Sequence, residues 1–222
     1  MKNIFLLILF LVSVAAFGQY GWTDAEVYLT DGSVLKGEAK ITMHSSAGLL
    51  KPKFIVRRDK VVFRKEKGEE RQRFKHYEIK EIKFNYNNFE SRYVPVKIKK
   101  SSKHARFMKV IYEGEKASLY QRLTKYAVSS GGGYTTMGPG LSYYSSGSYS
   151  SGTEVEFWVD KPNDKHMYNL VNGAIRFKSY KNRLLDVFGD CASLVSKIED
   201  KEFTKNPLDL SRLLEDYNAC TK

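Results

Sequence analysis

The chain has 222 residues, 42% of them hydrophobic, and its 37 Lys and Arg against 25 Asp and Glu give a formal net charge of +12. This length suffices for one large domain or two small ones with a hydrophobic core. After the first residues no apolar stretch is long enough to cross a membrane as a helix, which excludes further membrane-spanning helices.

Residues 1–18 are expected to form a cleavable signal peptide. Lys2 is followed by an apolar run as far as Val14 and then by small residues ending at Gly18, which is the three-part layout of an export signal. The run is shorter than the about 20 residues that a transmembrane helix needs. We expect cleavage before Gln19, and no cysteine lies near that bond to accept a lipid. An uncleaved anchor or a buried N-terminal strand is the alternative.

Export would make the protein periplasmic or outer-membrane associated, and not a lipoprotein. Removal of the signal leaves 204 residues and, with Lys2 lost, a formal charge of +11. This charge is concentrated in one part of the chain, since residues 51–109 hold 20 Lys and Arg against 7 Asp and Glu. One half of the molecule is therefore expected to carry the positive field.

Residues 19–172 are expected to form a strand-rich domain. Glu26–Ile41 alternates apolar and polar residues around Asp31-Gly32, a dipeptide that tolerates the positive φ angles of a tight hairpin. Further strand-like runs occur at Phe54–Arg57, Val61–Arg64, Arg71–Phe74, Glu78–Phe84, Tyr93–Ile98, Phe107–Tyr112, Ala117–Tyr126 and Val155–Val159. Glu78–Phe84 fits a helix as well as a bulged strand. The pattern predicts an α+β fold with an antiparallel sheet or partly closed barrel.

Residues 129–153 consist almost entirely of Gly, Ser, Tyr and Thr and have no periodic apolar face. This composition predicts a flexible loop, and the strand-like segments on both sides make it a hairpin excursion within one domain. Tyr in a Ser and Gly background is also typical of adaptable binding loops, which is the functional alternative.

Residues 173–222 show helical spacing and predict a helical segment packed on the sheet domain. The first helix is expected over Tyr180–Phe188, ending at Gly189. Asp190 can cap a second helix, and Asn206 followed by proline can cap a third. The apolar residues at helical spacing in the last two helices are Cys191, Leu194, Val195, Ile198, Leu210, Leu213, Leu214 and Tyr217.

The two cysteines of the chain, Cys191 and Cys220, are expected to form a disulfide. Disulfides persist in exported proteins, and an antiparallel pairing of the last two helices places both thiols at the same end of a helical hairpin. The bridge would close a loop of about 30 residues, worth on the order of 3 kcal/mol in the chain-entropy model.

Basic residues alternate with apolar ones in two stretches, which predicts strands with one apolar and one cationic face. The cations of this candidate basic surface are Arg57, Arg58, Lys60, Arg64, Lys97, Lys99, Lys100, Lys103 and Arg106. Export argues against nucleic acid as the partner and favours lipid phosphate, lipopolysaccharide, acidic glycans or an acidic envelope protein. A solvated basic surface without a partner is the alternative.

No catalytic, metal-binding or cofactor-binding motif appears in the chain. The four histidines have no second ligand at zinc-binding spacing, and no serine nucleophile elbow or phosphate-binding loop is present. The sequence therefore favours a non-enzymatic binding or accessory module without metal or cofactor. Two alternatives remain, a subunit of an outer-membrane-associated complex and a hydrolase acting on envelope polymers.

The chain resembles a group of uncharacterised secreted proteins common in Bacteroidota. The resemblance lies in the signal ending Phe17-Gly18-Gln19, the hairpin LTDGSVLKGE, the segments YEIKEIKF and ASLYQRL, and the closing GDCASLVSKI and YNAC. It implies an envelope location and a strand-rich body with a helical tail. It implies no activity, cofactor or catalytic residue.

Overall fold

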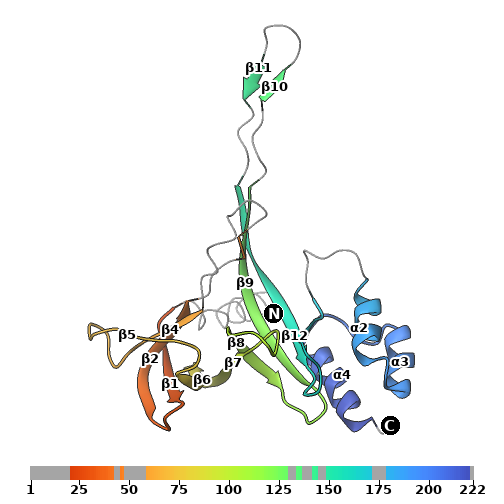
Figure 1. Ribbon diagram of the computed structural model, residues 1–222, viewed down its shortest axis with the longest axis horizontal. Helices are drawn as coiled ribbons and strands as arrows, with labels where there is room; N and C mark the ends of the chain where they lie inside the picture. Colours follow the sequence, from red (N-terminus) through yellow and green to blue (C-terminus); the bar gives the residue numbers. More distant parts are fainter. Residues whose placement is uncertain are drawn as a thin grey trace, which may run out of the picture.

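The computed structural model of the chain describes residues 21–42, 46–47, 59–129, 134–136, 142–144, 149–171 and 179–220 (Figure 1). The strands are β1 (Thr23–Leu29), β2 (Val34–Thr42), β3 (Ser46–Ala47), β4 (Lys60–Arg64), β5 (Gln72–Phe74), β6 (Ile79–Tyr86), β7 (Phe89–Val96), β8 (Arg106–Tyr112), β9 (Ser118–Ser129), β10 (Tyr134–Thr136), β11 (Ser142–Tyr144), β12 (Tyr149–Asp160) and β13 (Tyr168–Asn169). The helices are α2 (Tyr180–Phe188), α3 (Ala192–Glu199) and α4 (Pro207–Ala219). None of the helices in the described ranges is long and apolar enough to cross a membrane.

Ten strands form one antiparallel sheet in the order β13-β12-β9-β8-β7-β6-β1-β2-β4-β5, and β3 pairs in parallel with β9. The path is open, because no ladder between described residues joins β5 to β13. The predicted antiparallel, strand-rich fold is thus confirmed, and the ambiguous segment Glu78–Phe84 forms strand β6. The predicted signal peptide and the strand expected at Phe54–Arg57 lie outside the described residues.

The first hairpin forms where the Asp31-Gly32 dipeptide predicts it. Strands β1 and β2 pair from Thr23–Ala39 to Tyr28–Val34, and Gly32 has a φ of +91°, a conformation that residues with a Cβ rarely adopt. The carboxylate of Asp31 accepts hydrogen bonds from the backbone N–H and hydroxyl of Ser33, at 2.9 and 2.7 Å. The turn is therefore fixed by its own sequence.

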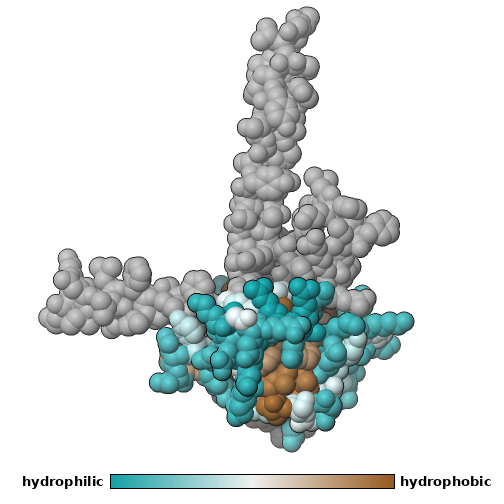
Figure 2. All heavy atoms as spheres, turned by 90° about the vertical axis from the view of Figure 1, so that its left-hand side faces the viewer, coloured by the Kyte–Doolittle hydropathy of each residue, from teal (hydrophilic) through white to brown (hydrophobic). Residues whose placement is uncertain are grey.

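One face of strands β1, β2, β4, β6, β7 and β8 forms a first core, the sheet core. It consists of Ala25, Val27, Ala39, Ile41, Val61, Phe63, Ile79, Ile82, Phe84, Tyr93 and Phe107, and Leu29, Leu35 and Phe74 pack at its rim. All of these residues come from the sheet or its flanks, so the sheet must curve to bury its own face. Figure 2 is seen from the end of the sheet where β1, β2, β4 and β5 lie, and it shows a hydrophobic area surrounded by hydrophilic side chains.

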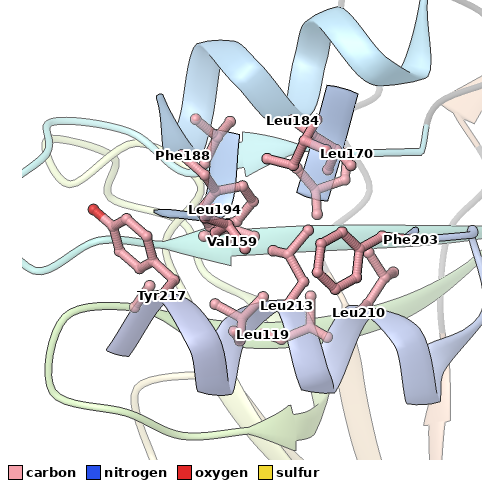
Figure 3. Packing of buried hydrophobic residues seen from close by; sticks show 14 of the residues in the cluster. Leu119, Val159, Leu170, Leu184, Phe188, Leu194, Phe203, Leu210, Leu213 and Tyr217 are labelled. Atoms are coloured by element: carbon pink, nitrogen blue, oxygen red, sulfur yellow. The ribbon is translucent and has the colours of Figure 1, made fainter. Parts of the chain in front are cut away.

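The helices cover a second core, the helix core, at the other end of the sheet. Leu119 of β9 and Val159 of β12 pack in one cluster with Leu184 and Phe188 of α2, Leu194 of α3, and Leu210, Leu213 and Tyr217 of α4 (Figure 3). Each buried Leu or Phe side chain contributes about 1.5–3 kcal/mol relative to exposure. The predicted buried positions Leu210, Leu213, Leu214 and Tyr217 are confirmed.

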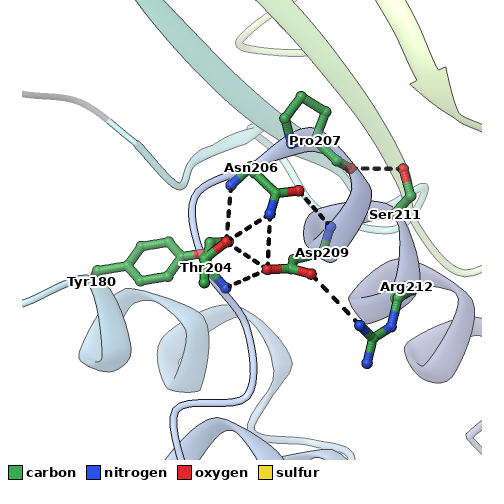
Figure 4. Close-up of polar contacts among 7 residues, drawn as sticks. All are labelled: Tyr180, Thr204, Asn206, Pro207, Asp209, Ser211 and Arg212. Atoms are coloured by element: carbon green, nitrogen blue, oxygen red, sulfur yellow. Dashed lines mark hydrogen bonds and ion pairs between the residues drawn. The ribbon is translucent and has the colours of Figure 1, made fainter. Parts of the chain in front are cut away.

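Local sequence sets the starts of the helices, with one correction. Asn206 caps α4 by accepting a hydrogen bond from the Asp209 N–H at 2.9 Å, and Pro207 follows as the first helical residue, as predicted (Figure 4). The prediction that Asp190 caps α3 is wrong, because Cys191 is the capping residue. The carboxylate of Asp190 instead accepts a hydrogen bond from the Tyr217 hydroxyl at 2.7 Å.

Two connections hold α4 in place. The predicted disulfide is present, with Cys191 and Cys220 Cα atoms 6.1 Å apart, and it links the start of α3 to the end of α4. The side chain of Asn218 accepts hydrogen bonds from the backbone N–H groups of Lys116 (2.8 Å) and Ala117 (3.2 Å) and donates one to the Ala117 carbonyl (3.0 Å). This amide pairs with the start of β9 as a neighbouring strand would.

Within residues 129–153 the structure describes 129, 134–136, 142–144 and 149–153, and all of these are strand residues. The ladder between β9 and β12 continues to the pair Ser129–Tyr149, and β10 pairs with β11. In Figure 1 the two long strands rise away from the rest of the sheet. The Tyr and Thr residues of these stretches favour strands, and each added pair of the ladder satisfies further backbone groups.

Candidate functional site

The structure divides the nine cations predicted to form a basic surface into three groups. Arg57 and Arg58 lie outside the described residues. Three of the others make ion pairs within the protein, and four are exposed and make no ion pair with any described residue. The ion-paired residues are Arg64, Lys100 and Arg106, and the exposed ones are Lys60, Lys97, Lys99 and Lys103.

Arg106 belongs to a largely buried ion-pair network rather than to a free cationic face. Its Nη1 atom lies 3.3 Å from Oδ1 of Asp59, whose side chain has no exposed surface. Nη2 of Arg122 lies at the same distance from that oxygen, and the Phe107 N–H donates to Oδ2 at 3.3 Å. A buried carboxylate requires such partners, so the cation is oriented inward.

This network also explains how distant strands are brought together. The ladder between β8 and β9 ends at the pair Lys109–Gln121, and beyond it Asp59 binds groups of both strands in the fork where they separate. Lys60 follows directly as the first residue of β4. The structure therefore places the beginnings of β4 and β8 side by side, which their sequence separation did not indicate.

The residues between β7 and β8 are held against the segment that follows β12. Lys99 and His166 form an antiparallel bridge, the Lys100 N–H donates to the Lys165 carbonyl at 3.0 Å, and the Met167 N–H donates to the Ile98 carbonyl at 2.9 Å. Residues 97–103 and 160–166 thus form one surface of the protein.

Lys100 links the two segments of this surface. Its ammonium group lies 3.2 Å from the Asp160 carboxylate and donates hydrogen bonds to the carbonyls of Lys161 (3.1 Å) and Pro162 (2.9 Å). The ion pair and the two hydrogen bonds hold the ammonium group against the second segment. Lys100 is therefore a structural residue here, which corrects its assignment to a free basic surface.

Four exposed lysines remain on the two segments, and we call them the lysine surface: Lys97, Lys99, Lys103 and Lys165. None of them makes an ion pair with any described residue. Residues 97–103 and 160–166 together hold six lysines and two aspartates, a formal charge of +4. The arrangement can attract and hold an anionic group without any chemical step.

The neighbouring acidic residues are engaged elsewhere. Asp164 accepts a hydrogen bond from the Tyr168 hydroxyl at 2.8 Å, and this bond raises the pKa of Tyr168. Lys161 contacts Asp190 at 3.4 Å and lies over the Tyr217 ring, 4.5 Å from its centroid, so it ties β12 to the helices. The lysine surface is thus left with little local neutralisation.

Sequence reasoning found three members of the lysine surface and missed Lys165. Lys97, Lys99 and Lys103 stand in one basic stretch, whereas Lys165 stands in a segment with as many acidic as basic residues. Its position depends on the bridge between Lys99 and His166, which connects residues 67 positions apart. No local pattern carries that information.

One hollow of about 400 Å³ lies beside the disulfide, between α3 and α4, and its charged lining groups are Lys197 and Asp216. These two groups form an ion pair at 2.9 Å. Within the described residues, no group of three His, Cys, Asp or Glu side chains is arranged to hold a metal ion. The hollow thus offers no unpaired charge for binding.

In comparisons with protein-family models, with curated proteins and with solved structures, no match was found.

Proposed function

We propose that this is an exported, non-enzymatic envelope protein whose lysine surface holds an anionic partner, such as lipid phosphate, lipopolysaccharide or an acidic glycan. The observation that carries the proposal is the set of four exposed ammonium groups on two bridged segments, none of them paired with a carboxylate of the described residues. Each lysine near an anionic membrane surface is worth about 1 kcal/mol, so four suffice for peripheral attachment.

Two features support export to the periplasm or the outer membrane. Residues 1–18 have the layout of a cleavable signal, and the disulfide between Cys191 and Cys220 belongs to the class of bond that persists in oxidising compartments. The resemblance to secreted proteins of Bacteroidota agrees with that location.

The ladder between β9 and β12 favours a second role, as a subunit of an outer-membrane-associated complex. The ladder spans twelve residue pairs, but β13 covers only Trp158 and Val159 of β12. The remaining edge of β12 has no strand partner among the described residues, and such an edge can pair with a strand of another protein. Extraction in mild detergent should then co-purify partners in fixed proportion, and isolation of the chain alone would contradict this role.

We also propose that the curved sheet closes partly into a barrel. Three contacts support this: β3, which follows β2, pairs with β9; Asp59 at the start of β4 binds β8 and β9; and the sheet core draws on both β4 and β8. A barrel of this kind would bury one sheet face without a covering layer.

The lysine surface is tested with the triple variant Lys97→Glu, Lys99→Glu, Lys103→Glu, in which Lys100 is kept because of its structural contacts. Binding is measured by co-sedimentation with vesicles of phosphatidylcholine and phosphatidylglycerol at low ionic strength. With about 1 kcal/mol per lysine, we expect binding to weaken about 100-fold or more. Higher salt should weaken the unmodified protein in the same direction.

A matched control reverses three exposed lysines elsewhere, Lys67→Glu, Lys80→Glu and Lys201→Glu, and so changes the net charge equally. We expect this control to keep most of the binding. Equal losses in both variants would show that overall charge, not the lysine surface, attracts the vesicles, and that result would refute the proposal.

A further inference from the structure

Three cations gather around a single aromatic ring on the sheet face opposite the sheet core. The centroid of the Trp22 ring lies 4.1 Å from the guanidinium carbon of Arg64, 4.6 Å from the ammonium nitrogen of Lys40 and 5.8 Å from the guanidinium carbon of Arg71. We call these four residues the Trp22 cluster. One cation over a ring is a common stabilising contact, but three cations at one ring also repel each other.

The sheet register places the cluster on the face opposite the sheet core. Lys40 pairs with Val62, and Glu38 pairs with Arg64. Because paired residues and residues two apart share a face, Lys40 and Arg64 lie on the same face of β2 and β4. The alternate residues Ala39, Ile41, Val61 and Phe63 point into the sheet core. Arg71 is exposed, and Trp22, Lys40 and Arg64 are half-buried, so the cluster opens to solvent.

Arg64 is the fixed member of the cluster. Its Nε atom makes an ion pair with Glu38 at 2.5 Å, and its side chain is only 11% exposed. The two Nη groups have no hydrogen bond to any described residue. The carboxylate therefore orients the guanidinium and leaves its outer donors available, and such a planar pair of donors matches the oxygens of a phosphate group.

Lys40 and Arg71 are the unbalanced members. Neither makes an ion pair with a described residue. Lys60 and Arg73 lie on the same face, because Val62 pairs with Arg73 and Lys60 stands two residues before Val62 in β4. Bringing these charges together is unfavourable in the free protein, and an anion of more than one charge would relieve the repulsion.

We infer that the Trp22 cluster is a binding site for a phosphate monoester, held between the Nη donors of Arg64 and the charges of Lys40 and Arg71. A phosphate monoester carries about −1.5 to −2 charges and three acceptor oxygens, which suits three converging cations better than a carboxylate with one charge. The phosphate can belong to a lipid headgroup or to a small soluble molecule.

The site is separate from the lysine surface, which lies on residues 97–103 and 160–166. The inference does not depend on the proposed function, and separate experiments test the two proposals. The lysine surface is tested with a phosphodiester lipid and charge reversal, and the Trp22 cluster with phosphomonoesters and charge removal at residues that the first test leaves unchanged.

Binding is followed by tryptophan fluorescence in a Trp158→Phe background, in which Trp22 is the single tryptophan. The probes are inorganic phosphate, glycerol 3-phosphate, and phosphatidylcholine vesicles with or without phosphatidic acid. The test variant is Lys40→Gln with Arg71→Gln, which keeps the ion pair between Arg64 and Glu38. The matched control is Lys60→Gln with Arg73→Gln, which removes the same charge from the same face without touching the ring.

We expect a saturable change in Trp22 fluorescence with at least one phosphomonoester probe. The test variant should bind that probe about tenfold more weakly, or weaker still, because each charge-assisted hydrogen bond contributes about a factor of ten to affinity. The control should change it less than about threefold. Vesicle binding alone would identify a lipid headgroup, and equal binding of free glycerol 3-phosphate a soluble ligand. No response to any probe, or equal loss in both variants, would overturn the inference.

Discussion

Replacement of Asp59 by alanine should destabilise the protein more than the loss of any exposed ion pair. The Asp59 side chain is fully buried, and its partner Arg122 is 8% exposed. Without the carboxylate Arg122 keeps a buried positive charge, and its Nε atom already has no hydrogen-bond partner among the described residues. Removing one member of a buried pair costs about 3–5 kcal/mol, which is the decrease we expect in the free energy of unfolding.

Urea unfolding, followed by circular dichroism, measures this change at constant m-value. The control is Glu26→Ala, which removes the ion pair with Lys36, a residue whose side chain is 76% exposed, and a hydrogen bond from the Tyr28 hydroxyl; it should destabilise the protein much less than Asp59→Ala. The double variant Asp59→Ala, Arg122→Met removes both buried charges and should be more stable than Asp59→Ala alone. If Asp59→Ala costs less than about 1 kcal/mol, or if Arg122→Met recovers nothing, the buried-charge reasoning is wrong.

Three further predictions concern the helices. Asn218→Ala should lower the free energy of unfolding, measured in urea, by about 1–3 kcal/mol, because the backbone groups before β9 lose their hydrogen-bond partner. An unchanged free energy would show that Asn218 does not hold α4 to β9. Replacing Cys191 and Cys220 by alanine should cost about 3–4 kcal/mol for a loop of about 30 residues, and a loss below about 1 kcal/mol would show that the bridge does not constrain the unfolded chain. Partial burial opposes ionisation of Asp190, but the hydrogen bond from Tyr217 and the Lys161 charge outweigh it and lower the pKa of Asp190. The ionised Asp190 therefore stabilises the fold above the pKa that Asp190 has in the unfolded chain, and this stabilisation is lost as pH falls through the lower folded pKa. Tyr217→Phe should flatten the dependence of the free energy of unfolding on pH below about pH 4. The same pH profile in the variant and the unmodified protein would refute this.

Local signals in the sequence were sufficient for many elements of the fold. The hairpin at Asp31-Gly32 and the capped start of α4 at Asn206 follow from contacts within a few residues, so short motifs predict them. The disulfide followed from two cysteines at the ends of adjacent helices. In each case the deciding interaction is close in sequence or is constrained by the length of a helix.

The candidate sites depended on contacts that the sequence does not display. Asp59 binds Arg122, 63 positions away, and Lys99 bridges to His166. Trp22 meets Arg64 only because β1, β2 and β4 are neighbours in the sheet. Charge counting located the basic half of the chain, but strand order decides which cations are paired with carboxylates and which remain exposed.

The strand order also has a consequence for how the chain folds. Among the ladders of the described residues, those of β1 with β6 and of β3 with β9 connect the first half of the sheet, β1 to β5, with the second half, β6 to β13. The main path of the sheet is thus two meanders, β1-β2-β4-β5 and β6-β7-β8-β9-β12-β13, which are joined by the ladder between β1 and β6, where Val27 pairs with Ile82. Hairpins within each meander can form in microseconds, whereas the junction must close a much longer loop. Docking of the two meanders is therefore expected to set the folding rate, and substitutions at this junction should slow folding more than those within a hairpin.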